Sequence, residues 1–412
     1  MGLFGGMKWK LRLGDKVIKR KICMIVDNPV VNDMRVLKEA KSLGSSGYTV
    51  HIYCQQSNGL AATEVIGDNV EVRRVYGPHL GTTFYIDKYL EAHFTLMNKI
   101  TERYDIIHCH DTETWPIGYI LSKQQGAHFI CDVHEYFPDY ILRDTYPSEY
   151  RYLLAQNLMQ ARGQYIRYAD KVITVSESLA SALQEEFLLE EKPTVIMNSR
   201  PRKDYVRVSS RILREKYNID EKTAIIFYQG KIDESRGLEL AIDALPLIDN
   251  VKLILAGFGP EEYINRLQAR AYDRDCEDKL LFIGFINYKD LIAYTESADI
   301  LIFTGRACTK NITYCFPNKF FDYLYTSKPI ITTQLQEMEK IIKEHGIGET
   351  VQENDPKAFA TAVNKLVHDQ ELLSGLRERK QKLIDIFSWE NEEEKLINLY
   401  QSLTSISNTT HP

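Results

Sequence analysis

The stretch AIIFYQGKIDESRGLELAIDALPLIDNVKLILAG, residues 224–257, decides the fold class of this sequence. It begins with a short apolar run, continues as a helical pattern over residues 237–248 and ends with a second apolar run. Short apolar runs bounded by turn residues are typical of buried strands. A strand, a helix and a second strand in this order form a right-handed crossover between parallel strands. Residues 224–257 therefore predict one βαβ unit of a parallel sheet.

The same alternation covers most of the chain. The other strand-like runs are KICMIVD (21–27), TVHIYC (49–54), VEVRRVY (70–76), DIIHCHD (105–111), HFICDV (128–133), KVITVS (171–176), TVIMN (194–198), KLLFIG (279–284), DILIFT (299–304) and KPIITT (328–333). Helical patterns separate them, which predicts parallel sheets covered by helices on both faces. We expect an α/β protein with two doubly wound, Rossmann-like domains, at residues 21–200 and 201–385. Residues 1–20 form a basic and apolar leader, and residues 386–412 hold a C-terminal helix that returns to the first domain.

Composition narrows the class of protein. The chain has 412 residues, which is enough for about two domains, and 44% of them are hydrophobic. A net charge of -6 gives no general reason to bind nucleic acid. No apolar run reaches the length of a membrane span, and no signal peptide is recognisable, so we expect a cytoplasmic protein. The seven cysteines include no C-x-x-C pair, which favours buried thiols over disulfides or a metal site.

The first 21 residues differ in kind from the rest. MGLFGGMKWKLRLGDKVIKRK interleaves apolar side chains with lysines and arginines, a composition suited to an anionic lipid surface. The apolar residues do not keep a helical period, so a basic leader without a binding role is the alternative. We expect peripheral contact with the inner face of the membrane through residues 1–21.

Basic side chains of the second domain follow the carboxyl ends of predicted strands. Open α/β sheets bind ligands beyond the carboxyl ends of their strands. Gly230 ends a predicted strand there, and Lys231 and Arg236 follow it, an arrangement that suits a diphosphate. In FPNKFFDYLYTSKPII (316–331), Pro317 is suited to the first position of a helix, which leaves the amides of Asn318 and Lys319 and the Lys319 ammonium to hold a phosphate.

The same rule selects polar residues of the first domain. They are Asn32, Arg35, His110, Asp111, His134 and Glu135. His108, His110 and Asp111 could in principle bind zinc, although a core histidine is the commoner role of His108 inside a strand. The first domain has no G-x-G-x-x-G, and this argues against a dehydrogenase.

Several stretches, taken in order, resemble the retaining glycosyltransferases of family four. They are NDMRVLKEAKSLGSSGYTV, DIIHCHD, CDVHEYFPD, ADKVITVSESLA, YQGKIDESRGLELAI, LILAGFGPEE, LLFIGFINYKDLIAYTESADILI and NITYCFPNKFFDYLYTSKPII. Each is loose alone, but the series in this order is specific, and the resemblance extends over residues 21–403. It implies the GT-B fold, in which two Rossmann-like domains face each other across a cleft.

The resemblance also implies an activity and roles for residues. It implies transfer of a hexosyl or N-acetylhexosaminyl group from a UDP- or GDP-sugar to a glycan or lipid-linked acceptor, with no cofactor and no catalytic metal. Lys231 and Arg236 match the basic pair on the donor diphosphate, and His134 matches the active-site histidine near the donor sugar. Asp322 matches the second acid of the E-x7-E motif, which holds the ribose, and backbone near Phe285 reads the base.

The chain departs from the family at two points. Asp322 is one methylene shorter than the motif's glutamate, and Tyr314 stands where the first acid belongs, so the sequence is a variant with Pro-Asn-Lys before the second acid. A surface salt bridge between Lys319 and Asp322 is the plain alternative for this helix. For the whole chain, the alternatives to a transferase of cell-surface polysaccharide or glycoconjugate synthesis are a nucleotide-sugar epimerase and a non-catalytic partner subunit.

Overall fold

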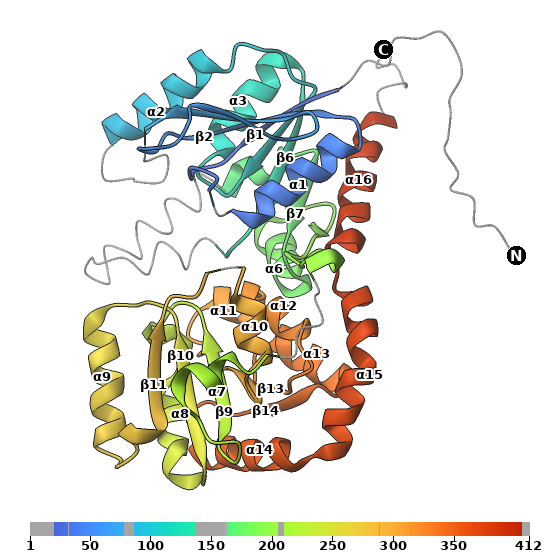
Figure 1. Ribbon diagram of the computed structural model, residues 1–412. Coiled ribbons are helices and arrows are strands. Elements are labelled where there is room, and N and C mark those ends of the chain that lie inside the picture. The colour runs from blue at the N-terminus through green and yellow to red at the C-terminus, as the bar shows by residue number, and fades with distance from the viewer. Residues whose placement is uncertain are drawn as a thin grey trace, which may run out of the picture.

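Two sheets, each with its own layers of helices, make up the protein. The computed structural model describes residues 20–31, 33–77, 86–136, 161, 163–204, 210–287 and 289–405. Residues 1–19 of the leader predicted at 1–20, and Asn32, lie outside the described residues. In Figure 1 the sheet drawn in blue and green lies above the sheet drawn in yellow and orange.

The first sheet has eight strands, of which all but one pair are parallel. Their order is β3 (Thr63–Gly67), β4 (Val70–Tyr76), β2 (Thr49–Gln55), β1 (Lys21–Ile25), β5 (Ile106–His110), β6 (His128–Val133), β7 (Lys171–Thr174) and β8 (Thr194–Val195). Its helices include α1 (Met34–Ser45), α2 (Ile86–Lys99), α3 (Trp115–Gln125) and α6 (Glu177–Phe187).

The second sheet has six parallel strands. Their order is β11 (Leu280–Gly284), β10 (Val251–Ala256), β9 (Ala224–Gln229), β12 (Ile300–Phe303), β13 (Ile330–Thr333) and β14 (Gly348–Val351). The helices that follow β8 in the chain are α7 (Ile212–Tyr217), α8 (Glu239–Ala244), α9 (Glu261–Tyr272), α10 (Leu291–Glu296), α11 (Lys310–Tyr314), α12 (Asn318–Leu324), α13 (Gln336–His345), α14 (Pro356–His368), α15 (Gln370–Ile386) and α16 (Trp389–Ser405).

The predicted fold class is confirmed, with two strands added. Every predicted run forms a strand, and the structure adds β3 and β14. β3 pairs antiparallel with β4 at the edge of the sheet and is largely exposed, so it lacks the apolar run that signals a buried strand. β14 consists of only four residues, GETV, which carry little pattern.

The order of the strands places the ligand-binding edge. In the first sheet β1 lies between β2 and β5, so the direction of winding reverses beside β1. In the second sheet β9 lies between β10 and β12, and winding reverses there. Doubly wound sheets bind ligands at such points, outside the carboxyl ends of the strands. The loops after β1, β5, β9 and β12 are therefore the expected walls of a site.

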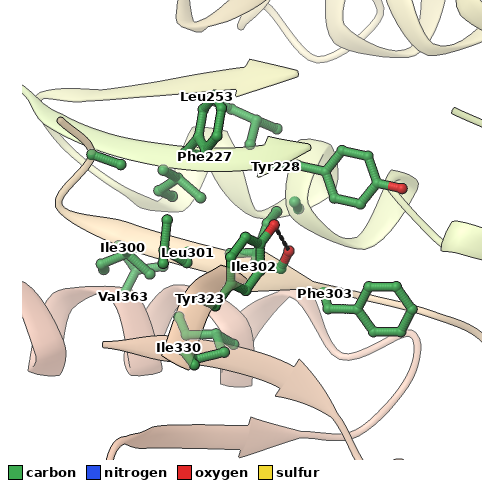
Figure 2. Close-up of a cluster of buried hydrophobic side chains, with 14 of the residues drawn as sticks. Phe227, Tyr228, Leu253, Ile300, Leu301, Ile302, Phe303, Tyr323, Ile330 and Val363 are labelled. Atoms are coloured by element: carbon green, nitrogen blue, oxygen red, sulfur yellow. Dashed lines mark hydrogen bonds between the residues drawn. The ribbon is translucent and has the colours of Figure 1, made fainter. Parts of the chain in front are cut away.

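The core of the second domain positions two of these loops. Figure 2 shows Phe227, Leu253, Ile302 and Ile330 packed together, with the Tyr323 hydroxyl donating a hydrogen bond to the Ile302 carbonyl at 3.1 Å. Tyr228 and Phe303 lie to one side of this cluster, at the carboxyl ends of β9 and β12 (Figure 2). These two aromatic side chains are buried, and both strands are therefore anchored next to the site.

The C-terminal helix links the two domains. In Figure 1, α15 lies beside the second domain and α16 lies beside the first, next to α1. Trp389 and Tyr400 of α16 are buried in the same cluster as the core of β1 and β2. The Trp389 indole N–H donates to Ser42 Oγ of α1 at 3.0 Å. The last helix of the described residues thus packs on the first domain, although it follows α15 of the second.

None of the helices in the described part of the chain is both long enough and apolar enough to cross a bilayer. All seven cysteines are free thiols. The four cysteines of predicted strands, Cys23, Cys54, Cys109 and Cys131, are buried as expected, whereas Cys308 is exposed.

Candidate functional site

A cavity of about 520 Å³ lies between the carboxyl ends of the two sheets. Ligand pockets typically have volumes of about 300 to 1,000 Å³. Of the residues selected from the sequence, those lining it are Arg35, His134, Glu135, Gly230, Lys231, Arg236, Phe285, Asn318, Lys319 and Asp322. His110 and Asp111 do not line it but contact His134 from behind. The structure thus brings residues of both domains around one space.

Gly230 allows a lysine to approach the backbone at the end of β9. Gly230 has a φ of 120°, and a Cβ added there would lie 2.6 Å from Lys319 Nζ. Lys319 Nζ lies 3.9 Å from the centre of the Tyr228 ring and donates to the Tyr228 hydroxyl at 2.7 Å. That hydroxyl donates in turn to the Lys231 carbonyl at 2.6 Å. Only glycine at position 230 leaves room for the Lys319 ammonium beside the backbone. Hydrogen bonds through the Tyr228 hydroxyl then connect Lys319 to the backbone of Lys231.

The loop after β9 holds two further cations around one carboxylate. Lys231 Nζ lies 3.2 Å from Asp233 Oδ2, and Arg236 Nε lies 3.8 Å from Asp233 Oδ1. Asp233 also accepts from the Ser235 amide at 3.0 Å and so caps the turn that carries Arg236. Among the described residues, Arg236 Nε has no hydrogen-bond partner. The turn therefore presents guanidinium and ammonium groups to the cavity.

The start of α12 differs from the expectation. Pro317 is in extended conformation at the N-cap, one position before the helix, and α12 itself has only seven residues. Asn318 is exposed, and its side-chain oxygen accepts a hydrogen bond from Asn198 at 2.9 Å. Asn198 lies in the interdomain connection, which is the segment of the chain between β8 and α7. A helix this short has a weak dipole. The side chain of Lys319, more than the helix start, therefore brings α12 to this wall of the cavity.

Asp322 lies in a buried network. Its two carboxylate oxygens accept hydrogen bonds from Arg200 Nε and, at 2.7 Å, from Gln229 Nε2. Burial raises the pKa of Asp322, and the Arg200 guanidinium opposes this shift. Lys319 donates to Tyr228 instead of pairing with Asp322. The alternative of a surface salt bridge between Lys319 and Asp322 is therefore wrong.

His134 lies between two carboxylates on the opposite wall. Its Nδ1 is 3.2 Å from Asp111 Oδ2, and its Nε2 is 3.1 Å from Asp132 Oδ2. The Asp111 carboxylate also accepts from the His134 amide at 3.1 Å. Burial lowers the pKa of His134, but Asp111 and Asp132 outweigh it, and the net shift is well upward. A ring with acceptors at both nitrogens is an imidazolium, because only that form donates twice.

Behind His134 lies a group of buried polar residues, Arg35, Glu39, His108, His110 and Asp132, which we call the charge cluster. Arg35 donates to Asp132 through Nε at 3.0 Å and through its terminal nitrogen at 2.8 Å. Its Nε also lies 3.1 Å from Glu39 Oε1. Burial raises the pKa of Glu39 to about 7, although Arg35 opposes this shift. Arg35 therefore supports the carboxylate that holds His134.

The three residues that could in principle bind zinc, His108, His110 and Asp111, do not form one group. The rings of His108 and His110 stack at 4.3 Å, but Asp111 pairs with His134. Glu39 and Asp132 replace Asp111 as neighbours, with ligand atoms within 4.8 Å of one another. The Arg35 guanidinium contacts both of these carboxylates.

Glu135 and Tyr314 lie where the two domains meet. Glu135 Oε2 accepts from the Asn311 side-chain amide at 3.0 Å, and Asn311 accepts from the Tyr136 amide at 2.9 Å. The Tyr314 ring packs edge-on against Tyr136 at 6.2 Å, and its carbonyl accepts from the Ser176 hydroxyl. Tyr314, at the position of the first motif acid, thus contributes to the domain interface.

Sequence reasoning missed Asp132, Glu39, Arg200 and Gln229. Asp132 interrupts the apolar run HFICDV, and an acid inside a buried strand is a signal that could have been used. Glu39 follows Arg35 by four residues on α1, which places both on one helix face. Arg200 and Gln229 carry no such signal in the sequence.

Comparison with known proteins agrees with this arrangement. The model of Glycosyltransferase Family 4 matches residues 34–199, and the model of Glycosyl transferases group 1 matches residues 209–383. An uncharacterised glycosyltransferase of Methanocaldococcus jannaschii is 24% identical over 380 residues, which cover 88% of this chain and 92% of that protein.

Solved structures show the same architecture. Sucrose-phosphate synthase of Thermosynechococcus elongatus superposes with a TM-score of 0.75 at 18% identity, covering 94% of this chain and 100% of that one. HepE of Anabaena in complex with UDP-glucose gives a TM-score of 0.66 at 17% identity, covering 93% and 99%. The chain is thus a glycosyltransferase of the GT-B fold, with a Glycosyltransferase Family 4 domain followed by a Glycosyl transferases group 1 domain.

Proposed function

We propose that the protein transfers a hexosyl or N-acetylhexosaminyl group from a UDP- or GDP-sugar to a glycan or lipid-linked acceptor, with retention of the anomeric configuration. The observation that carries the proposal is the pairing of two walls in one cavity. One wall presents Lys231, Arg236 and Lys319, and the other presents His134. The similar fold of HepE was solved with UDP-glucose, which supports a nucleotide-sugar donor.

The three cations bind the donor diphosphate in this proposal. Two of them, Lys231 and Arg236, follow β9, while Lys319 reaches the same point from α12 beneath Gly230. Charge-assisted hydrogen bonds to phosphate are about twice as strong as neutral ones. As the bond between sugar and phosphate breaks, negative charge grows on the diphosphate. Removing one such donor typically costs about 3 kcal/mol in the barrier.

The nucleoside lies along the same wall in this proposal. Phe285 follows β11, is 71% exposed and lines the cavity, so its backbone can read the base. Asp322 binds the ribose. Because its oxygens already accept from Arg200 and Gln229, it uses remaining lone pairs for the hydroxyls.

The proton of the acceptor goes to the departing phosphate on the same face of the sugar. His134 cannot take it, because both ring nitrogens of the imidazolium are already protonated. We therefore assign His134 to contacting the donor sugar at the wall of the cavity. The reaction needs no cofactor and no metal in this scheme.

The acceptor enters from the first domain. A second cavity, of about 640 Å³, shares Asp33, Arg35, Asn198, Asn318 and Asp322 with the first and extends toward Met34 and Lys38. We assign Arg35 and Glu135 to the acceptor side, with Asn32 of the same loop outside the described residues and with His110 and Asp111 supporting it from behind. Contact of residues 1–21 with the inner face of the membrane would bring a lipid-linked acceptor of cell-surface polysaccharide or glycoconjugate synthesis to this opening.

Binding and transfer experiments test the proposal. Calorimetry with UDP, GDP and ADP compares the wild type with Arg236→Ala and with Lys343→Ala, a control that removes an exposed lysine paired to Glu339. We expect one nucleotide to bind and Arg236→Ala alone to weaken it by about tenfold or more. No binding of any nucleotide would remove the donor proposal. Proton NMR of the product formed from that donor series shows retention or inversion directly.

The alternative functions make different predictions. An epimerase would form an epimer of the nucleotide sugar without an acceptor, and none of the relatives named above supports it. A non-catalytic subunit would keep its cellular function when Lys231 and Arg236 are replaced by alanine.

A further inference from the structure

The C-terminal helix contributes one polar atom to the charge cluster. Tyr400 of α16 is fully buried, and its hydroxyl lies 2.6 Å from His108 Nδ1. α16 follows α15 of the second domain, so a side chain from the end of the chain contacts the centre of the first domain. A buried tyrosine hydroxyl needs a partner, and His108 is the one it has among the described residues.

The neighbours of His108 determine its tautomer. His108 Nε2 lies 3.8 Å from Asp132 Oδ2 and 4.0 Å from Glu39 Oε2. A bare lone pair at Nε2 would face two carboxylates and be repelled, so Nε2 carries the hydrogen. Nδ1 is then the acceptor, and the Tyr400 hydroxyl is the donor. Burial lowers the pKa of His108 to about 3, which keeps the ring neutral.

The same carboxylate faces both His108 and the cavity histidine. Asp132 Oδ2 lies 3.8 Å from His108 Nε2 and 3.1 Å from His134 Nε2, and it also accepts from Arg35. The contacts therefore run from Tyr400 through His108 and Asp132 to His134. Every member except His134 is fully or almost fully buried, and so solvent does not screen the interactions between them.

We propose that Tyr400 is a positioning residue for His134. By holding His108 as the Nε2–H tautomer, it keeps a positive edge toward Asp132, and Asp132 then holds His134 as an imidazolium at the wall of the cavity. The link to catalysis rests on the proposed function, in which His134 contacts the donor sugar.

Other charged groups act on the same residues. Arg35 contacts Asp132 and Glu39, Lys38 lies beside Glu39 on α1, and Asp111 holds the second nitrogen of His134. His110 Nδ1 lies 3.3 Å from Asp132 Oδ2. A variant that removes only the Tyr400 hydroxyl leaves all of these groups in place, and its effect is therefore specific to the link through His108.

The test compares Tyr400→Phe with Tyr48→Phe. The Tyr48 ring packs edge-on against Tyr400 at 5.7 Å, so this control keeps the apolar contact and the Tyr400 hydroxyl. NMR of ¹⁵N-labelled protein reports the protonation of the ring nitrogens, and single His→Gln variants assign the ten histidines. Transfer assays over a range of pH give kcat and the donor KM for the same three proteins.

We expect wild-type His134 to stay doubly protonated to a higher pH than an ordinary histidine, and His108 Nδ1 to be unprotonated. In Tyr400→Phe, His108 should populate both tautomers, and His134 should lose its proton at lower pH. The kcat should fall about tenfold with the donor KM within about twofold, and the alkaline limb of the pH profile should move to lower pH. Tyr48→Phe should match the wild type in the NMR titrations, in kcat, in the donor KM and in the pH profile.

Three outcomes would overturn the proposal. The first is that His134 of the wild type titrates like an ordinary histidine. This outcome is measured on the wild type alone, so it does not depend on whether a variant folds. A second is an unchanged His134 titration in folded Tyr400→Phe, even if activity falls. The third is stoichiometric zinc in the purified protein, because a metal would then hold His108 and Asp132. An altered His134 titration with unchanged kcat would leave the link intact and would remove His134 from the donor site instead.

Discussion

Arg200 of the interdomain connection donates its Nε hydrogen to Asp322 of α12, 122 residues away in sequence. The Arg200 carbonyl accepts from the Tyr325 hydroxyl at 2.6 Å and from the Trp389 amide at 2.8 Å. The connection between the domains is thus fastened to the helix that carries the proposed ribose ligand and to the start of α16. Asp322 consequently has a structural role beside the proposed binding role, and the two can be separated by experiment.

Asp322→Ala should reduce the free energy of unfolding by about 3 kcal/mol, because it leaves the buried Arg200 guanidinium without this carboxylate. Asp385→Asn is the matched control, since its carboxylate is exposed and lies 3.7 Å from Arg202; it should cost less than about 0.5 kcal/mol. Urea denaturation of both variants measures the difference. A loss below about 1 kcal/mol for Asp322→Ala would show that Arg200 does not depend on it.

Asp322→Asn should abolish discrimination between UDP and 2′-deoxy-UDP, if UDP is the nucleotide that binds. Asparagine keeps the shape of the side chain but replaces one acceptor oxygen by a donor. The wild type should prefer UDP by about tenfold, the value of one good hydrogen bond to a charged group. Calorimetry of the wild type and of Asp322→Asn, each with UDP and with 2′-deoxy-UDP, gives the coupling energy between the Asp322 carboxylate and the ribose 2′-hydroxyl. A variant that keeps the preference would assign Asp322 to structure alone.

UDP binding should take up a proton at Lys319. Burial, together with the neighbouring Arg236 guanidinium, holds the pKa of Lys319 well below its usual range. A bound diphosphate favours the ammonium form and raises this pKa, so the affinity should increase as the pH falls between the two values. Calorimetry in buffers of different protonation enthalpy counts the protons. The proton uptake on UDP binding should vanish in Lys319→Met and persist in Lys343→Met. If the wild type takes up no proton when UDP binds, the prediction is wrong.

Gly230→Ala should weaken nucleotide binding, and Gly59→Ala should not. Both positions have a positive φ, 120° and 81°, so each substitution should cost about 1 kcal/mol of stability from backbone strain. Only at Gly230 would the added Cβ meet Lys319 Nζ, whereas nothing lies within 4 Å at Gly59. We expect the Kd for nucleotide to rise about tenfold for Gly230→Ala alone. Equal affinities would place Lys319 outside the diphosphate site.

His134→Gln should reduce stability in a pH-dependent manner. Asp111 and Asp132 raise the pKa of His134 in the folded protein, so its contribution is fully present below the unfolded value of about 6.5. It is lost as the pH rises through the folded value. The difference in the free energy of unfolding between wild type and variant should therefore be constant below about pH 6 and shrink at alkaline pH. Replacing the exposed His368 by glutamine controls for the exchange of side chain itself.

The sequence by itself determined the two parallel sheets and the edge at which they bind ligands. Apolar runs alternate with helical patterns at a local spacing, and the carboxyl ends of parallel strands lie at one edge whatever else the chain does. For that reason Lys231, Arg236 and His134 could be selected as cavity residues before their positions were known. The antiparallel strand β3 was not predicted from the sequence, because an exposed edge strand needs no apolar run.

Only the tertiary structure decided which side chains are partners. Asp132 meets Arg35 and His134, and Asp322 meets Arg200, because strand order and the packing of two domains bring together residues that are far apart in the chain. Because a charge that is removed from water must be paired, each of these buried side chains needs its partner to remain charged. No local pattern encodes such a pairing. The tertiary structure therefore decided that His134 is an imidazolium and that Asp322 is bound to the interdomain connection.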